Sequence, residues 1–296
     1  MPSADQALPL RHAIALGLLQ GPAELLPISS SAHTTLVPWL AGWPYARLAG
    51  EQRKSFEVAL HAGAGAALAI HMRGQLLRDA ARVDPRRAGV IAAALAPPAL
   101  AGYALGPAIE RRLGGPRSIA AGLAAGAVAM AVADRRVART NDSATADDNG
   151  ACSAGGPSGR AQEDATARDG LALGLAQTAA LIPGVSRNGA TLSAARARGF
   201  ARADSQALSW HAGLPIILGA SMLQGARMRR RGVPREQRAA LAVGGICAFA
   251  STLAGARLLT RPLHEGGPLW PYSLYRCALA AIVVRRHRRE RGGRAQ

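Results

Sequence analysis

The sequence predicts an all-α fold: a polytopic helical membrane protein with two inverted repeats, each containing a broken, re-entrant helix pair. Three observations support this prediction, namely long uncharged windows, arginines gathered between them, and a polar motif that occurs twice. The chain has 296 residues and a formal net charge of +18. We expect one integral membrane domain over residues 1–296, with a first repeat at about 8–133 and a second at about 170–284.

The uncharged windows are long enough for membrane helices. They cover residues 88–109, 118–133, 170–186, 205–226 and 239–256. A helix needs roughly 20 apolar residues to cross the hydrocarbon core. Since backbone polar groups in lipid must bond within their own segment, windows of this length are expected to be helices. The chain is therefore expected to cross the membrane several times.

The arginines cluster between these windows, for example at residues 227–231 and in a basic tail at 285–296. Basic loops beside membrane helices are typical of the positive-inside bias and of contact with anionic headgroups. Aromatic residues make up only 4% of the chain, which leaves few side chains for base stacking. We therefore expect no nucleic-acid partner.

The first repeat opens with a helix that is expected to continue through Glu24 and to break at Pro27. Proline lacks the amide proton and clashes with the preceding turn. One of the serines at 29–31 can then cap a new helix. Further helices are expected at 56–72 and in the windows that follow.

A change of composition separates the two repeats. Residues 140–169 are rich in Gly, Ser, Asp and Ala and nearly free of large apolar side chains. Such a stretch cannot bury enough surface to offset its ordering entropy, so we expect a disordered loop. The second repeat begins at Gly170, breaks at Pro183-Gly184 and restarts as a helix near Ser186.

The two breaks resemble each other in sequence. LLPISSSAHTTL at 25–36 aligns with LIPGVSRNGATL at 181–192, which places Ser30 on Ser186. His-Ala-Gly at 61–63 recurs at 211–213. Self-similarity of this kind indicates an internal repeat.

The first break carries groups that suit catalysis. Gln20 and Glu24 are four residues apart and project from one helix face. A carboxylate at membrane depth is costly and is a functional hypothesis by default, although a structural hydrogen bond to another helix is the alternative. Ser30 and His33 are three apart and share a face, so the histidine is expected to take or relay the serine proton.

The second break carries a positive charge. Arg187 follows it directly, in an apolar stretch where a guanidinium needs an anion, and its planar fork suits phosphate. Each break also ends in a helix N-terminus, whose amides favour phosphate groups. The residues alone therefore predict an anionic, phosphorylated ligand inside a membrane protein.

Three blocks, QGPAELLPISSSAH, FEVALHAG and IPGVSRNGAT, resemble the signature blocks of the undecaprenyl-diphosphate phosphatases, the bacitracin-resistance family. Tyr275-Arg276 resembles a tyrosine-arginine pair in that family's last helix. The resemblance implies a bacterial cell-membrane enzyme that hydrolyses undecaprenyl diphosphate to undecaprenyl phosphate and inorganic phosphate. That reaction recycles the lipid carrier for peptidoglycan synthesis and confers bacitracin resistance.

The resemblance also implies roles for individual residues. Glu24 is a tentative ligand of a divalent cation, Mg²⁺ or Ca²⁺. The implied catalytic residues are Glu24, Ser30, His33 and Arg187. The implied substrate-binding residues are Gln20, Ser29, Gly184, Ser186, Asn188, Thr191 and Arg276.

Three positions depart from the family pattern. Asn188 stands where serine is usual, Ala32 replaces the usual glycine, and Gln20 leaves one acidic group where many members have two. The departures put in doubt a hydroxyl role at Asn188 and the strength of cation binding.

A transporter is the main alternative. Inverted repeats with broken helices also build many secondary transporters, so a carrier of a lipid phosphate or another anion shares these features. Acid-phosphatase-like lipid phosphatases fit less well, because the next histidine after Arg187 is the distant His211. The expected partner is a polyprenyl diphosphate lipid, while a homodimer and the side of the membrane that the site faces stay open.

Overall fold

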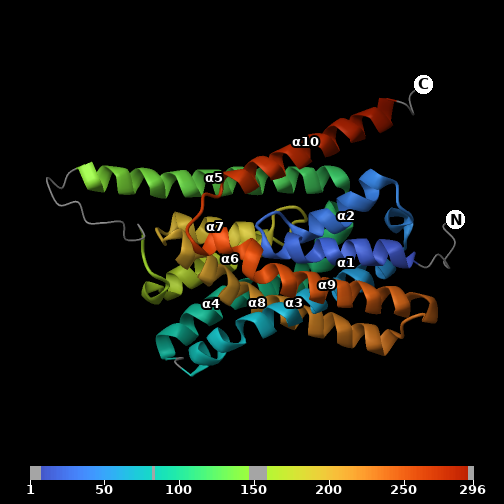
Figure 1. Ribbon diagram of the computed structural model, residues 1–296, viewed down its shortest axis with the longest axis horizontal. Coiled ribbons are helices and arrows are strands. Elements are labelled where there is room, and N and C mark those ends of the chain that lie inside the picture. Colours follow the sequence, from blue (N-terminus) through green and yellow to red (C-terminus); the bar gives the residue numbers. More distant parts are fainter. Residues whose placement is uncertain (1–7, 82–83, 147–158, 293–296) are drawn as a thin grey trace. The chain divides into compact units, whose positions relative to one another are not determined.

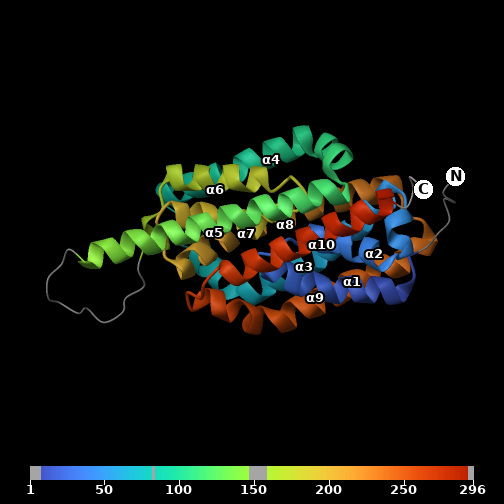
Figure 2. The same cartoon turned by 90° about the horizontal axis from the view of Figure 1, so that it is seen from above.

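The computed structural model describes residues 8–81, 84–146 and 159–292. In these stretches the chain forms helices joined by short connections, which confirms the all-α prediction (Figures 1 and 2). The helices are α1 (Leu10–Leu25), α2 (Ser30–Ala41), η1 (Pro44–Arg47), α3 (Gly50–Ala80), α4 (Pro85–Leu113), α5 (Pro116–Ala146), η2 (Gln162–Asp164), α6 (Ala167–Ala179), α7 (Arg187–Ala197), α8 (Arg202–Arg231), α9 (Arg235–His264) and α10 (Trp270–Gly292).

The chain divides into two compact units. Unit 1 comprises Met1–Arg82 and Leu214–Thr260, and unit 2 comprises Val83–Gly213 and Arg261–Gln296. Each unit thus combines helices from both predicted repeats, since α9 belongs to unit 1 while α4 and α5 belong to unit 2. The inverted relation of the two repeats stays a prediction.

Three helical segments are long and apolar enough to cross a membrane: Pro85–Leu113, Pro116–Arg135 and Arg235–Arg261. They contain three of the predicted windows, and they confirm the multi-pass membrane class. The window at 170–186 differs, because it includes the break between α6 and α7 and does not form one continuous helix.

In unit 1, two glycines bring α1 close to α9. A Cβ atom on Gly17 would collide with Gly244 O, and one on Gly21 would collide with Ser251. Ser251 Oγ also donates to Gly17 O at 3.0 Å. Small residues at this spacing let two membrane helices approach closely. The pairing with α9 fixes the part of α1 that leads into the first break.

In unit 2, α6 packs on α4 in the same way. A Cβ atom on Gly170 would collide with Val90 O, and one on Gly174 would collide with Ala93 O. The glycine pair is again four residues apart, so one face of α6 carries the contact. This packing fixes the helix that leads into the second break.

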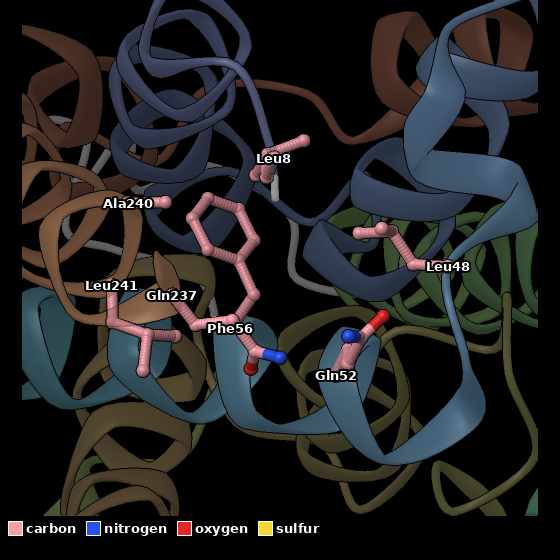
Figure 3. A pocket seen from close by; sticks show the side chains of 7 residues that line it. All are labelled: Leu8, Leu48, Gln52, Phe56, Gln237, Ala240 and Leu241. Atoms are coloured by element: carbon pink, nitrogen blue, oxygen red, sulfur yellow. The ribbon is translucent and has the colours of Figure 1, made fainter. Parts of the chain in front are cut away.

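A small apolar pocket lies in unit 1 near the start of α1. Figure 3 shows the Phe56 ring between Leu8 and Ala240, which belong with it to the apolar core of this unit. The pocket contains none of the predicted site residues. Its lining consists of Leu8, Leu48, Gln52, Phe56, Gln237, Ala240 and Leu241.

The segment at 140–169, predicted to be a disordered loop, is ordered at both ends. Helix α5 extends to Ala146, and residues 147–158 lie outside the described residues. Beyond them, Arg160 and Arg198 bond to the buried carboxylate of Asp169 at 2.9 and 2.6 Å. Ion pairs here replace the apolar burial that the composition lacks.

Asp169 is held strongly as a carboxylate. Burial alone raises the pKa of Asp169, but hydrogen bonds from Arg160, Arg198 and Thr166 outweigh it and lower the pKa well below the ordinary value. Thr166 is also the N-cap of α6 and forms a capping box with Asp169. The network therefore ties the start of α6 to the end of α7.

Candidate active site

The first broken pair lies in unit 1, between Leu25 at the end of α1 and Ser30 at the start of α2. Pro27 lies in the break, which confirms the predicted position. Ser29 has φ 76°, a value that residues with a side chain rarely adopt, and it makes no side-chain cap bond. Helix α2 thus starts abruptly, with Ser30 as its first residue.

One carboxylate oxygen of Glu24 contacts several polar side chains near this break. Ser30 Oγ donates to Glu24 Oε2 at 2.7 Å, and Gln20 Nε2 donates to the same oxygen at 3.2 Å. His61 Nε2 of α3 lies 3.6 Å from it. Glu24 is only 5% exposed, and shielding from water strengthens such contacts. The carboxylate is therefore placed to take the serine proton, as a general base does for a nucleophile.

Two histidines near this break, His33 and His61, have fixed ring orientations. Nδ1 of His33 lies 2.7 Å from Ser29 O, and Nδ1 of His61 lies 2.8 Å from Glu57 O. Because a carbonyl oxygen only accepts, Nδ1 carries the proton in both rings. Nε2 of a neutral His33 is then an acceptor. Nε2 of His61 faces Glu24 and forms an ion pair with it when the ring is protonated.

The second broken pair lies in unit 2, and its backbone is held from several directions. Gly184 has φ 97° and lies so close to Ile119 O that a Cβ atom would collide. Ser186, with φ 66°, caps α7 by accepting from Gly189 N at 3.2 Å. Arg276 Nη2 donates to the carbonyl oxygens of Gly184 and Val185 at 3.1 and 2.8 Å. The predicted break at Pro183-Gly184 is confirmed.

Asn188 and Thr191 face α8. Ser209 Oγ donates to Asn188 Oδ1 at 2.7 Å and also contacts Thr191 Oγ1. All three side chains are almost fully buried. This hydroxyl-amide network ties α7 to α8 directly behind Arg187, and substrate binding by Asn188, Thr191, Ser186 or Gly184 stays a prediction.

Arg187 is the first residue of α7 and is partly exposed. Its guanidinium carbon lies 6.0 Å from the ring centre of Trp210, within range of a cation–π contact. A Cβ atom on Gly213 would collide with its guanidinium. The glycine of the repeated His-Ala-Gly block therefore leaves room on α8 for the arginine side chain.

Comparison with known proteins agrees with this arrangement. Residues 13–282 match the family model described as Bacitracin resistance protein BacA. The chain belongs to this family.

Relatives of the BacA family match nearly the whole chain. An undecaprenyl-diphosphatase of Geobacter sulfurreducens is 35% identical over 289 residues, which cover 93% of this chain and 97% of that protein. The undecaprenyl-diphosphatase of Geobacter metallireducens is 33% identical over 92% and 96% of the two chains. That of Rubrobacter xylanophilus is 32% identical over 94% and 98%.

The geometry adds two residues to those inferred from the BacA resemblance. The sequence could have marked His61 as a site candidate, because it lies in the FEVALHAG block and begins the repeated His-Ala-Gly. No pattern marks Ser209, since a serine in an apolar helix is common. The contact of Ser30 also differs from expectation, because its hydroxyl donates to Glu24, whereas His33 turns its Nδ1 to the Ser29 carbonyl. The catalytic role of His33 stays a prediction.

The same break offers oxygen ligands for a cation. Among the described residues, no group of three or more His, Cys, Asp and Glu side chains could hold a metal ion. Gln20 Oε1, however, is buried beside Glu24 and has no hydrogen-bond partner in the described part of the chain. Mg²⁺ often takes one or two protein oxygens and completes its shell with water and substrate phosphates. Binding of a divalent cation by Glu24 with Gln20 Oε1 stays a prediction.

Proposed function

We propose that this chain hydrolyses undecaprenyl diphosphate to undecaprenyl phosphate and inorganic phosphate in the bacterial cell membrane. The observation that carries the proposal is the 2.7 Å contact between Ser30 Oγ and Glu24 Oε2 at the first break. A hydroxyl bonded to a buried carboxylate is an activated nucleophile, which a phosphatase needs. Membership of the BacA family and the names of its relatives support the choice of substrate.

The reaction we assign to Ser30 has two steps. Ser30 Oγ attacks the terminal phosphorus while its proton passes to Glu24. The bond from phosphorus to the bridging oxygen breaks, and undecaprenyl phosphate leaves. Water then attacks the phosphoserine, inorganic phosphate departs, and the serine oxygen recovers a proton.

The histidines support these proton transfers. His61 Nε2 lies 3.6 Å from Glu24 Oε2 and helps to hold that carboxylate toward Ser30. We assign His33 to the second step, because its Nδ1 bond to Ser29 O makes Nε2 of the neutral ring the nitrogen that accepts a proton from the attacking water. His61 is then a positioning residue that acts through Glu24.

The second break supplies positive charge. The family resemblance implies that the guanidinium fork of Arg187 binds phosphate oxygens, and electrostatic stabilisation of the transferring group is a large effect in phosphoryl transfer. Arg276 holds the carbonyl oxygens of the break and so fixes where α7 begins. A divalent cation on Glu24 and Gln20, when bound, would neutralise part of the diphosphate charge.

The test is phosphate release from a prenyl diphosphate by the purified full chain in detergent. We expect release by the wild type, strong loss in Ser30→Ala and Glu24→Gln, and near wild-type rates in the matched control Ser31→Ala. Size-exclusion fractions are assayed separately, because the sequence leaves a homodimer open.

The transporter alternative predicts the opposite result. Broken helix pairs in a multi-pass membrane protein are compatible with a carrier of lipid phosphate or another anion. Absence of phosphate release by the intact protein, with and without added Mg²⁺ or Ca²⁺, would reject the hydrolase and favour that carrier.

A further inference from the structure

One end of unit 2 is densely basic. It combines the last turn of α4, the first turn of α5 and the last turns of α10. Only two acidic residues among the described ones, Glu110 and Glu290, belong to these turns. The arginines of this end, called the arginine end below, are Arg111, Arg112, Arg117, Arg285, Arg286, Arg288, Arg289 and Arg291.

Antiparallel packing of α5 and α10 brings these turns together. Leu269 N at the start of α10 donates to Asp134 Oδ2 at 3.4 Å, and Arg276 further along packs against Gly126. Residue numbers rise along α10 as they fall along α5, so the end of α10 lies by the start of α5 (Figures 1 and 2). The Gly114-Gly115 turn places the end of α4 beside them.

Toward the opposite end of unit 2, four arginines are paired with two buried carboxylates. Asp134 bonds to Arg196 and Arg202 at 3.1 and 2.8 Å. Asp169 bonds in the same way to Arg160 and Arg198. At the arginine end, by contrast, two acidic residues face eight arginines, most of them exposed. The arginine end therefore carries a surplus of positive charge that its own carboxylates do not offset.

An apolar band leads directly to these arginines. On α10, the exposed Leu274, Ile282 and Val284 precede Arg285. On α4, the exposed Leu100 and Leu105 precede the basic turn in the same way. Exposed apolar side chains along a membrane helix face lipid tails, and long basic side chains at the helix end reach the headgroups.

We propose that the arginine end binds the headgroups of anionic phospholipids. The surface offers several guanidinium groups at headgroup depth, and their forks bind phosphate oxygens of neighbouring lipids. Juxtamembrane clusters of four to eight basic residues are the pattern that anionic lipid selects. Exposed apolar side chains lie beside the arginines. A lipid can contact them with its acyl chains while its headgroup binds the arginines, whereas a nucleic acid has no acyl chains to place there.

The test measures lipid binding to the full chain in detergent by native mass spectrometry, with phosphatidylglycerol and phosphatidylcholine compared at equal concentrations. The wild type is expected to bind phosphatidylglycerol at least tenfold more tightly. Replacing Arg285, Arg286, Arg288, Arg289 and Arg291 by Gln should remove most of that preference. Replacing the same five by Lys should keep much of it, because the charge is retained.

Three results would overturn the proposal. The first is an unchanged preference for phosphatidylglycerol in the Gln variant, with size-exclusion and thermal unfolding showing that the variant is folded. The second is displacement of the lipid by millimolar inorganic phosphate, which would indicate a site for the free ion. The third is tighter binding of a single-stranded RNA oligonucleotide than of phosphatidylglycerol.

Discussion

The two broken helix pairs share a design and differ in what their polar groups do. Each has a serine with positive φ before the restarted helix, Ser29 in unit 1 and Ser186 in unit 2. The next residue, Ser30 or Arg187, opens that helix and is the one to which we assign a role in the reaction. Ser186 caps α7 through Gly189 N, whereas Ser29 makes no side-chain cap bond.

The helices before the breaks show the same contrast. Glu24 and Gln177 each follow the second glycine of a close-packed pair by three residues. Gln177 Nε2 donates to Ala94 O of α4 at 3.0 Å, a structural bond. Glu24 instead accepts from Ser30 and Gln20. The polar groups of the first break therefore bond to one another, whereas those around the second break bond to the backbone and hold it in place.

The largest effect is expected at the first break. Ser30→Ala removes the nucleophile and Glu24→Gln removes the base, so each should lower kcat by roughly 10²- to 10⁴-fold. The measurement is single-turnover phosphate release from a prenyl diphosphate. The double variant should lose no more than the worse single variant, because the two groups act as one unit. Additive losses would contradict that coupling.

A smaller effect is expected at Arg187. Arg187→Lys keeps the charge and loses the fork, which we expect to lower kcat/KM by roughly 10- to 100-fold. Gly213→Ala should lower activity in the same direction, since the added Cβ displaces the guanidinium. Arg168→Lys, an exposed arginine on α6, is the matched control. Wild-type activity in Arg187→Lys and Gly213→Ala, as in the control, would show that Arg187 takes no part in the reaction.

His61 should have a moderate effect that is specific to kcat. His61→Ala removes the imidazole that lies against Glu24, and we expect kcat to fall about tenfold with little change in KM. His61→Gln should recover part of the loss by donating a hydrogen bond to Glu24. The control is His71→Gln on the same helix, at an exposed position. A rise in KM alone would indicate substrate binding instead.

Changes to the Ser209–Asn188 contact behind Arg187 should lower mainly the thermal stability of the protein. Ser209→Ala leaves the buried Asn188 Oδ1 without this donor, and a buried unsatisfied group costs about 1–3 kcal/mol. Asn188→Ser, which restores the residue usual in the family, should cost a similar amount here because the shorter side chain cannot reach Ser209. Thermal unfolding in detergent measures both, and losses that add fully in the double variant would contradict the contact.

The smallest effect is expected at Asp169 and depends on pH. The pKa of Asp169 is lower in the folded than in the unfolded chain, so its contribution to stability is complete above about pH 4 and falls as pH decreases toward the lowered value. The unfolding midpoint of the wild type should therefore drop more steeply between pH 5 and pH 3 than that of Asp169→Asn. Parallel curves for the two proteins would show that the ion pairs with Arg160 and Arg198 add nothing.

The sequence was most informative where one residue decides the local backbone. Pro27 and Pro183-Gly184 marked both breaks, and uncharged windows marked the spanning helices, because proline chemistry and charge desolvation act locally. Contacts such as that between Ser30 and Glu24 were harder to predict. The direction of a helix after a break does not follow from the spacing of its residues. The ordered part of 140–169 was missed because its stability comes from Arg160 and Asp169, not from apolar content.

The alignment of the two motifs shows the same limit. Sequence identity placed Ser30 on Ser186, while the backbone pairs Ser29 with Ser186 as the residues before α2 and α7. In a chain rich in Ala and Ser, identical residues do not determine the alignment of two motifs to within one position. The shift matters, because it makes Ser30 and Arg187 structurally equivalent, each as the first residue of the helix after its break.

In the proposed reaction, Ser30, held by Glu24, attacks the terminal phosphorus. The most direct test is the stereochemical course at that phosphorus, followed with a diphosphate whose terminal group is a thiophosphate made chiral by oxygen isotopes. Attack by Ser30 and then by water inverts the configuration twice, so net retention is expected. Net inversion would show direct attack by water and would contradict the assignment of Ser30 as nucleophile.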